Sequence, residues 1–176
     1  MTKEAKTLKP SPVRQAKENG LFTNELTDNQ AIRLLKDAVK ARKKAQYPNL
    51  PEHAIVTPNY EDKTANGLTR CIMDFLNSQD GCSSFRISNE GVMRIDKNGK
   101  AFRIKSSTQN GFSDTVNCVW GRFVSVEIKA GNDRQSEEQK AFQLQIENAR
   151  GYYFIAKDFT SFLDWFNLKM NRKHGS

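Results

Sequence analysis

Two stretches of the chain repeat apolar residues every three or four positions, which is the spacing of a helix that buries one face. The first is "DNQAIRLLKDAVKARKKA", and it follows Thr27, a residue type typical of a helix N-cap. The second runs from about Thr64 to Gln79. The apolar positions are Ala31, Leu34, Leu35, Ala38 and Val39 in the first stretch, and Leu68, Cys71, Ile72, Phe75 and Leu76 in the second. Both stretches are predicted as amphipathic helices.

Short runs that favour β-structure occupy the middle of the chain. "GCSSFRIS" is predicted as a strand that follows a stop at Gly81. "VMRIDKNGKAFRI" is predicted as a hairpin, because Asn98-Gly99 is the residue pair that a type I′ turn requires. Two more strands are expected at about 115–120 and 122–130.

The last third of the chain predicts a helix, a buried strand and a closing helix. These are "RQSEEQKAFQLQIENAR", "YYFIA" and "DFTSFLDWFNLKM", with Asp158 as the cap of the last helix. Strands enclosed by helices over residues 61–170 predict an α/β or α+β layered domain. Before it we expect a flexible basic arm at 1–26 and a basic helix with a Pro-rich connection at 27–60; a tail follows at 171–176.

Charge adds a candidate partner. The chain has 28 Lys and Arg against 20 Asp and Glu, a net charge of +8 and a pI near 9.5. This surplus is typical of proteins that bind a polyanion such as nucleic acid or an anionic membrane face. Lys40, Lys43 and Lys44 crowd the polar face of the first helix, where they either contact phosphates or form an ordinary solvated face.

The cysteine pattern and the lengths of the apolar runs indicate the cellular compartment that the sequence predicts. Three cysteines without a C-x-x-C pair indicate neither a disulfide framework nor a zinc site. The N-terminus has no apolar signal-peptide region, and no run of 18 apolar residues occurs. We therefore expect a cytoplasmic protein without a membrane partner.

Charged residues in the strand pair at 115–130 suggest a chemical site. Side chains alternate along a strand, so Val124, Val126 and Ile128 face the core while Ser125, Glu127 and Lys129 face the opposite side. If Trp120-Gly121 forms a two-residue turn, Val119 pairs with Arg122. The same register places Asp114 directly opposite Glu127, with Cβ atoms about 4.5–5.5 Å apart.

Two carboxylates at this separation repel each other, and one would acquire a raised pKa unless a cation lies between them. Carboxylate oxygens suit Mg²⁺, with water and a substrate phosphate completing its coordination. A neighbouring Lys129 could orient or deprotonate a water, or neutralise charge that develops on phosphorus. The tripeptide acid-x-Lys carries no information by itself, because it also begins at Glu4, Glu61 and Glu138. Its position in an alternating strand opposite an upstream Asp is what indicates a site.

These residues resemble the PD-(D/E)XK nucleases, and within them the VRR-NUC and Holliday-junction-resolvase-like branch. The resemblance lies in "GFSD", "VSVEIK", "DRQSEEQ" and "GYYFIA", and it extends over about residues 60–166 together with "NGLTRCIMDFL" and "CSSFRIS". It implies a restriction-endonuclease-like core, in which a helix precedes a mixed sheet whose central hairpin carries the catalytic residues. It also implies Mg²⁺ or Mn²⁺ as cofactor and DNA as partner, and a junction-resolving role would favour a homodimer.

The resemblance also implies a role for each residue. Asp114 and Glu127 resemble the two acids that bind the metal, with the Ile128 carbonyl as a further ligand, and Lys129 resembles the lysine that positions the attacking water. Gln139 resembles the polar residue that supports the site from the next helix. Because "SEEQ" from Ser136 is also a capping-box sequence, Gln139 is equally a candidate for a capping role.

The chain departs from the family pattern on the first helix, where many relatives carry a Glu. Here "KTANGLTRC" offers only Asn66, with Glu61 and Asp62 just upstream as substitutes. Ser113 also replaces the proline of the motif. Arg86 and Arg103 are candidates for phosphate contacts, with ordinary surface charge as the alternative reading.

The sequence thus predicts a metal-dependent nuclease that hydrolyses DNA. Two alternatives stay open: a catalytically silent nucleic-acid-binding module on the same fold, and an interaction protein with an incidental acidic pair.

Overall fold

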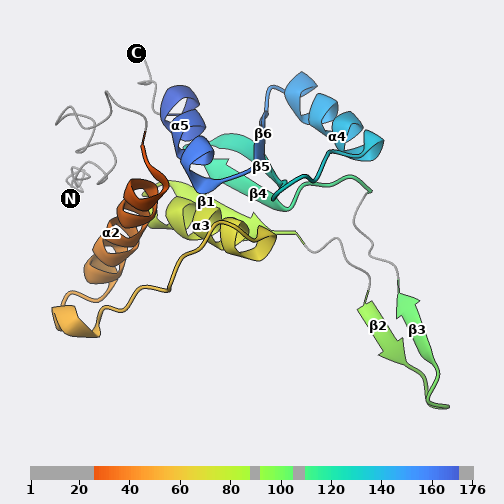
Figure 1. Ribbon diagram of the computed structural model, residues 1–176, viewed down its shortest axis with the longest axis horizontal. Helices are drawn as coiled ribbons and strands as arrows, with labels where there is room; N and C mark the ends of the chain where they lie inside the picture. Colours follow the sequence, from red (N-terminus) through yellow and green to blue (C-terminus); the bar gives the residue numbers. More distant parts are fainter. Residues whose placement is uncertain (1–25, 88–91, 105–109, 171–176) are drawn as a thin grey trace, which may run out of the picture.

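The computed structural model (Figure 1) describes residues 26–87, 92–104 and 110–170, in which helices come first, five strands follow, and a helix, a strand and a helix complete the order. Residues 1–25 of the arm predicted at 1–26, and the tail at 171–176, lie outside these residues. The helices are α2 (Asp28–Gln46), the short 3-10 helix η1 (Glu52–Ala54), α3 (Ala65–Ser78), α4 (Glu137–Asn148) and α5 (Phe159–Lys169). The strands are β1 (Cys82–Arg86), β2 (Val92–Ile95), β3 (Ala101–Ile104), β4 (Thr115–Val119), β5 (Arg122–Ile128) and β6 (Tyr152–Ala156).

Four of the strands form one mixed sheet in the order β1-β4-β5-β6, in which β1, β4 and β5 are antiparallel neighbours. The last strand, β6, runs parallel to β5, and α4 is the crossover that a parallel pair requires. The predicted α+β class, with a mixed sheet flanked by helices, is therefore confirmed.

The helix N-termini predicted from the sequence are confirmed. Thr27 forms a capping box with Gln30, and the side chains of Thr64 and Asp158 accept a backbone N–H of the first turn of α3 and α5. These caps satisfy amides that a helix start would otherwise leave without a partner.

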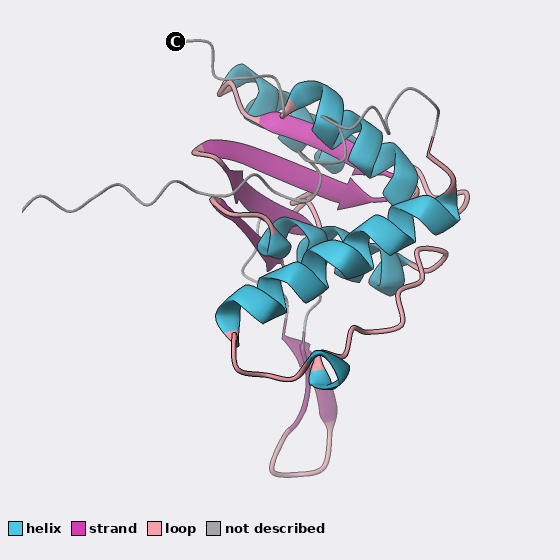
Figure 2. Ribbon diagram, turned by 90° about the vertical axis from the view of Figure 1, so that its left-hand side faces the viewer, coloured by secondary structure: helices cyan, strands magenta, loops and turns pink. Residues whose placement is uncertain are grey.

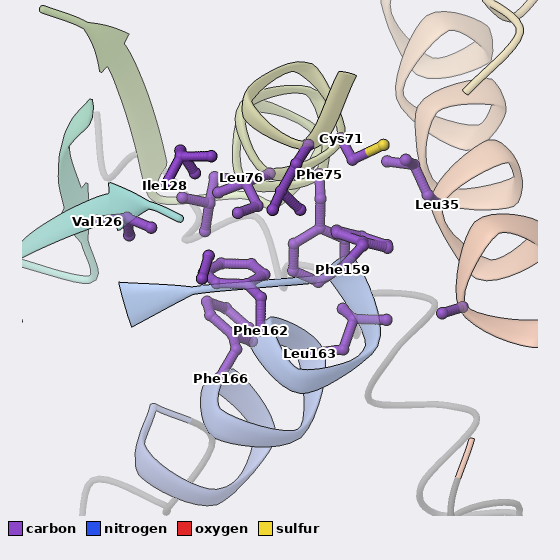
Figure 3. Close-up of a cluster of buried hydrophobic side chains, with 14 of the residues drawn as sticks. Leu35, Cys71, Phe75, Leu76, Val126, Ile128, Phe159, Phe162, Leu163 and Phe166 are labelled. Carbon is purple, nitrogen blue, oxygen red and sulfur yellow. The ribbon is translucent and has the colours of Figure 1, made fainter. Parts of the chain in front are cut away.

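The core lies between the sheet and helices α2, α3 and α5 (Figure 3). Phe75 of α3 is its centre, because its ring meets the edges of Phe159, Phe162 and Phe166 of α5 at centroid distances of 5.3–6.2 Å. The inward residues of β5 (Val124, Val126 and Ile128) pack on the same cluster, as the alternation predicted. The first helix belongs to this core as well, through Leu35 and its neighbours.

The β4–β5 turn has the predicted register, with Val119 opposite Arg122. Trp120 and Gly121 both have positive φ, 49° and 79°, as a type I′ turn requires. Tryptophan tolerates this backbone here because its side chain is held: Nε1 donates to the Asp80 carbonyl at 2.9 Å, and the ring lies 5.6 Å from that of Phe166. Trp120 therefore packs against the domain at this turn.

The β2–β3 hairpin forms, but its predicted type I′ turn is wrong. Ile95 pairs with Ala101, and Asp96 and Lys100 close a three-residue loop in which only Gly99 has positive φ, at 79°. The Asp96 carboxylate accepts the backbone N–H groups of Asn98 and Lys100 at 2.8 and 2.9 Å. This Asp side chain stabilises a wider loop than the Asn-Gly pair alone indicates.

A search of the described residues for a helix long and apolar enough to cross a membrane finds none.

Because Phe75 sits at the centre of the core, Phe75→Ala should lower the free energy of unfolding by about 3–5 kcal/mol. Phe85, on β1, is 59% exposed, so Phe85→Ala should change it by less than about 1 kcal/mol. Urea denaturation of both variants measures the difference, and equal losses would contradict this description of the core.

Candidate functional site

Three strands bring the predicted residues to one end of the sheet. Arg86 at the end of β1 pairs with Thr115 at the start of β4, and Thr115 pairs with Val126 of β5. Asp114 and Glu127 are the next positions along these two strands, as the predicted register requires. Asp114 is anchored there, because its carbonyl accepts the Ile87 N–H at 2.8 Å.

Glu127 is almost completely buried, with 2% of its surface exposed. One carboxylate oxygen, Oε1, accepts hydrogen bonds from Lys129 Nζ at 3.0 Å and from Gln139 Nε2 at 2.5 Å. The other, Oε2, is also buried but has no hydrogen-bond partner among the described residues. A buried carboxylate oxygen without a partner is costly, and it is rare in native proteins unless a ligand or an ion binds there.

Lys129 is buried beside it, with 6% of its surface exposed. Its ammonium group lies between two carboxylates: Glu127 at 3.0 Å and Asp133 at 3.2 Å. Asp133 is mostly exposed and belongs to the loop that leads from β5 to α4. The lysine is therefore held as a cation by one buried and one solvent-facing partner.

The face that carries these charges is covered, so Glu127 and Lys129 are not ordinary solvated surface residues. Ser125, on the same face of β5, is fully buried and pairs with Tyr153 of β6. Tyr153 lies against Phe142 of α4, with ring centroids 6.3 Å apart. Helix α4 thus covers this side of the sheet and excludes water from the base of the site.

Asp114 contacts the strand that carries the other residues. Its Oδ2 accepts the backbone N–H of Ile128 at 2.8 Å. In an extended strand the N–H and C=O of one residue point to the same side. The Ile128 carbonyl is therefore directed to the side on which Asp114 lies, as its predicted role as a metal ligand requires.

Burial, followed by the charge of Asp114, raises the pKa of Glu127 from 4.5 to about 7, although Lys129 opposes this shift. For Lys129, burial lowers the pKa, but hydrogen bonds to Glu127 and Asp133 outweigh it and raise the pKa above its ordinary value of 10.5. Lys129 is consequently an ammonium ion at neutral pH, while Glu127 gains and loses its proton close to neutral pH.

Gln139 caps α4 and also contacts Glu127, which is the placement that both of its predicted roles require. Its Oε1 accepts the Ser136 N–H at 2.9 Å, and the Ser136 hydroxyl accepts the Gln139 N–H, which completes the capping box of α4. Its Nε2 donates to Glu127 Oε1. One amide therefore joins the start of α4 to the buried carboxylate.

The segment before Asp114 is held close to the same helix start. Gly111 has a φ of 78°, and a Cβ there would lie 2.4 Å from the Glu138 carbonyl oxygen, so only glycine allows this approach. The ring of the next residue, Phe112, lies 4.4 Å from that of Phe142 of α4, with the two planes tilted by 35°. The "GFSD" motif thus fixes the position of Asp114 relative to Gln139.

Helix α3 supplies an amide at the site end of the sheet. Asn66, in the first turn of α3, accepts a hydrogen bond from Arg86 at 2.8 Å. Asp62 is buried, but its carboxylate accepts the Phe159 N–H at the start of α5 and so has a structural partner.

The candidate basic residues lie in different places. On α2, the ammonium groups of Lys43 and Lys44 donate to the carbonyls of Val56 and Leu50 and hold the Pro-rich connection, whereas Lys40 is exposed. Arg103 belongs to β3, and its side chain lies outside the part of the molecule that the structure describes.

Sequence reasoning missed Asp133 and Tyr153. Asp133 follows Lys129 by four residues in "AGND", but nothing in a loop sequence indicates which way it turns. Tyr153 could have been found by extending the strand alternation to β6, which pairs it with Ser125.

The residues present fit a hard divalent cation. Asp114, Glu127 and the Ile128 carbonyl offer only oxygen donors, which Mg²⁺ and Mn²⁺ prefer, and no described residue bonds the buried Glu127 Oε2. The described residues contain no group of three His, Cys, Asp or Glu side chains that could hold a metal. A metal here would rely on two carboxylates, one carbonyl, water and substrate.

Comparison with known proteins adds no relative. No family model matches the chain, and no curated protein sequence matches it significantly.

The Glu127 pKa makes stability depend on pH. Between pH 4.5 and 7 the folded protein keeps a proton that the unfolded chain has released, so the free energy of unfolding should fall as pH rises through this window. The loss should reach up to roughly 3 kcal/mol by pH 8 in the absence of divalent metal. Denaturation at pH 5–8 should show a flatter profile for Glu127→Gln and a wild-type profile for the exposed Glu52→Gln.

Mg²⁺ should offset this loss at pH 8 in the wild type but not in Glu127→Gln. Identical pH profiles of the wild type and Glu127→Gln would mean that Glu127 does not titrate in this range.

Proposed function

We propose that the protein is a metal-dependent nuclease that hydrolyses DNA phosphodiester bonds, on a restriction-endonuclease-like core. The observation that carries this proposal is the buried Glu127 carboxylate. One of its oxygens has no partner in the described part of the chain, a lysine cation lies 3.0 Å from the other, and a second acid lies on the adjacent strand. The resemblance of "GFSD" and "VSVEIK" to the PD-(D/E)XK motif supports the same function.

Asp114, Glu127 and the Ile128 carbonyl are the groups that would hold the metal. Bound Mg²⁺ would supply Lewis-acid stabilisation of the scissile phosphate and lower the pKa of a coordinated water. The two acids differ in setting: Asp114 is tied to the backbone of Ile128, and Glu127 is buried under α4.

Lys129 contributes as a cation. Because its pKa is raised, it keeps its proton at neutral pH and would neutralise negative charge that develops on the phosphate during attack by water. Asp133 and Glu127 hold the ammonium group in one position, which reduces the cost of orienting it during the reaction. Gln139 positions Glu127 in turn.

A catalytically silent nucleic-acid-binding module is the second candidate. The observation that favours it is Asn66 of α3, the helix on which many members of the resembled family carry a Glu. The Asn66 side chain instead accepts a hydrogen bond from Arg86. In that case the basic surface would bind DNA while the acidic pair would have no chemical task.

Cleavage of labelled duplex, single-stranded and branched DNA with Mg²⁺ or Mn²⁺ tests the proposal. Lys129→Ala and Asp114→Ala should each lower the rate by about 10²–10³, because each removes one group that acts on the developing charge or the metal. Lys169→Ala, an exposed lysine in the last turn of α5, is the matched control and should cut at the wild-type rate.

Thermal denaturation should confirm that the variants are folded. Metal-independent DNA binding without any cleavage, unchanged in Lys129→Ala and Asp114→Ala, would support the silent module instead.

The two roles of Gln139 can be separated. Ser136→Ala removes the cap but leaves Gln139 and Glu127, so it should cost about 1 kcal/mol of stability and little activity. Gln139→Ala removes its bond to Ser136 in the capping box and its bond to Glu127, and should lower activity at least tenfold beyond the effect of Ser136→Ala. Equal rates in the two variants, measured at the same folded fraction, would restrict Gln139 to capping.

A further inference from the structure

The β2–β3 hairpin stands apart from the layered domain. Among the described elements its two strands contact chiefly each other, and Figures 1 and 2 show it projecting beyond the helices and the main sheet. Neither face of this ribbon is covered by another described element.

The ribbon nevertheless carries large apolar side chains. Met93, Ile95 and Phe102 are 63%, 74% and 44% exposed. The register places Met93 and Ile95 on one face and Phe102, which pairs with Arg94, on the other. A two-stranded ribbon is marginally stable in water by itself, and exposed apolar side chains gathered on it indicate a surface that a partner covers.

Charge indicates which partner. The ribbon also presents three exposed basic residues: Arg94 on the face of Phe102, and Lys97 and Lys100 at the connecting turn. Its one acid in this stretch, Asp96, accepts two backbone N–H groups of the loop and is turned toward them. The outward charge is therefore positive, which suits a polyanion and opposes association with a second, equally basic copy.

The position of the ribbon adds a third observation. The chain enters it after β1 and returns to the main sheet at the segment from Asn110 to Asp114, so both connections leave from the end of the sheet that carries the candidate site. A molecule bound along the ribbon would lie beside that end.

We propose that the β2–β3 hairpin is an arm that binds duplex DNA next to the candidate site. A two-stranded ribbon fits a groove of the duplex. Arg94, Lys97 and Lys100 contact phosphates, and Met93 and Ile95 lie against the sugars and base edges of the groove. The inference rests on the proposed function in taking DNA as the substrate.

Binding of a fluorescent duplex, measured in EDTA over a series of salt concentrations, tests this arm without requiring cleavage. Arg94→Gln/Lys97→Gln/Lys100→Gln should weaken binding and reduce the slope of log K against log salt by roughly 2–3, since each phosphate contact contributes about 0.9. Met93→Ser/Ile95→Thr should weaken binding about tenfold at every salt concentration without changing the slope.

The matched control is Arg33→Gln/Lys36→Gln/Lys169→Gln, which removes the same charge from α2 and α5 and should keep at least most of the wild-type slope. The ribbon variants should melt at the wild-type temperature, because the ribbon does not pack on the core. A wild type without duplex affinity, or ribbon and control variants with equal slopes, would overturn the proposal.

Sedimentation of the same proteins measures their oligomeric state, and so tests whether a second copy of the chain covers the ribbon instead of DNA. If Met93→Ser/Ile95→Thr dissociates a dimer while duplex affinity is unchanged, the ribbon is a subunit interface and the proposal is wrong. The test separates this proposal from the proposed nuclease function. DNA binding that depends on the ribbon, without metal-dependent cleavage, would support the arm and contradict the nuclease. Metal-dependent cleavage with binding that does not depend on the ribbon would support the nuclease and contradict the arm.

Discussion

The ion pair between Glu127 and Lys129 is the constraint on which the site depends, because both charges are almost fully buried. Removing two ions from water costs several kcal/mol each, and their attraction compensates only when further hydrogen bonds satisfy the remaining oxygens and protons. Gln139 and Asp133 supply two such bonds, but Glu127 Oε2 has no partner among the described residues. Apolar residues of similar size would serve stability as well or better. The pair is therefore better explained by chemistry than by folding.

The fold provides what this pair needs by joining three segments that are distant in sequence. The tight turn at Trp120-Gly121 sets Asp114 beside the strand of Glu127, and the parallel crossover places α4 over the same face. Gly111 then allows the "GFSD" segment to approach the start of α4 closely, where Gln139 caps the helix and contacts Glu127. A change in the turn, in the crossover or in the contact at Gly111 would move the carboxylates, since the layers between them are close-packed.

Local patterns predicted most of this arrangement. The alternation in "VSVEIK" and the turn residues determined the register, because a shift of one residue would have moved Val124 and Val126 out of the core. What local patterns could not predict was burial of the charged face, which arises from a helix that returns across the sheet. The Asn98-Gly99 turn shows the same limit, since the Asp96 carboxylate changes the loop. Trp120 adopts a positive φ because of Asp80 and Phe166, both distant in sequence.

The molecule inverts the usual distribution of residues in two places. Charges are buried beside Lys129, and apolar side chains are exposed on the β2–β3 ribbon. Each feature costs free energy in the isolated chain: the first through lost hydration and the second through exposed apolar surface. Under the proposed function a single kind of ligand would relieve both costs, because a nucleic acid with its metal ion would bring a cation to Glu127 and a groove to Met93 and Ile95. The two sites lie toward the same end of the sheet, which is the arrangement expected if one extended substrate occupies both.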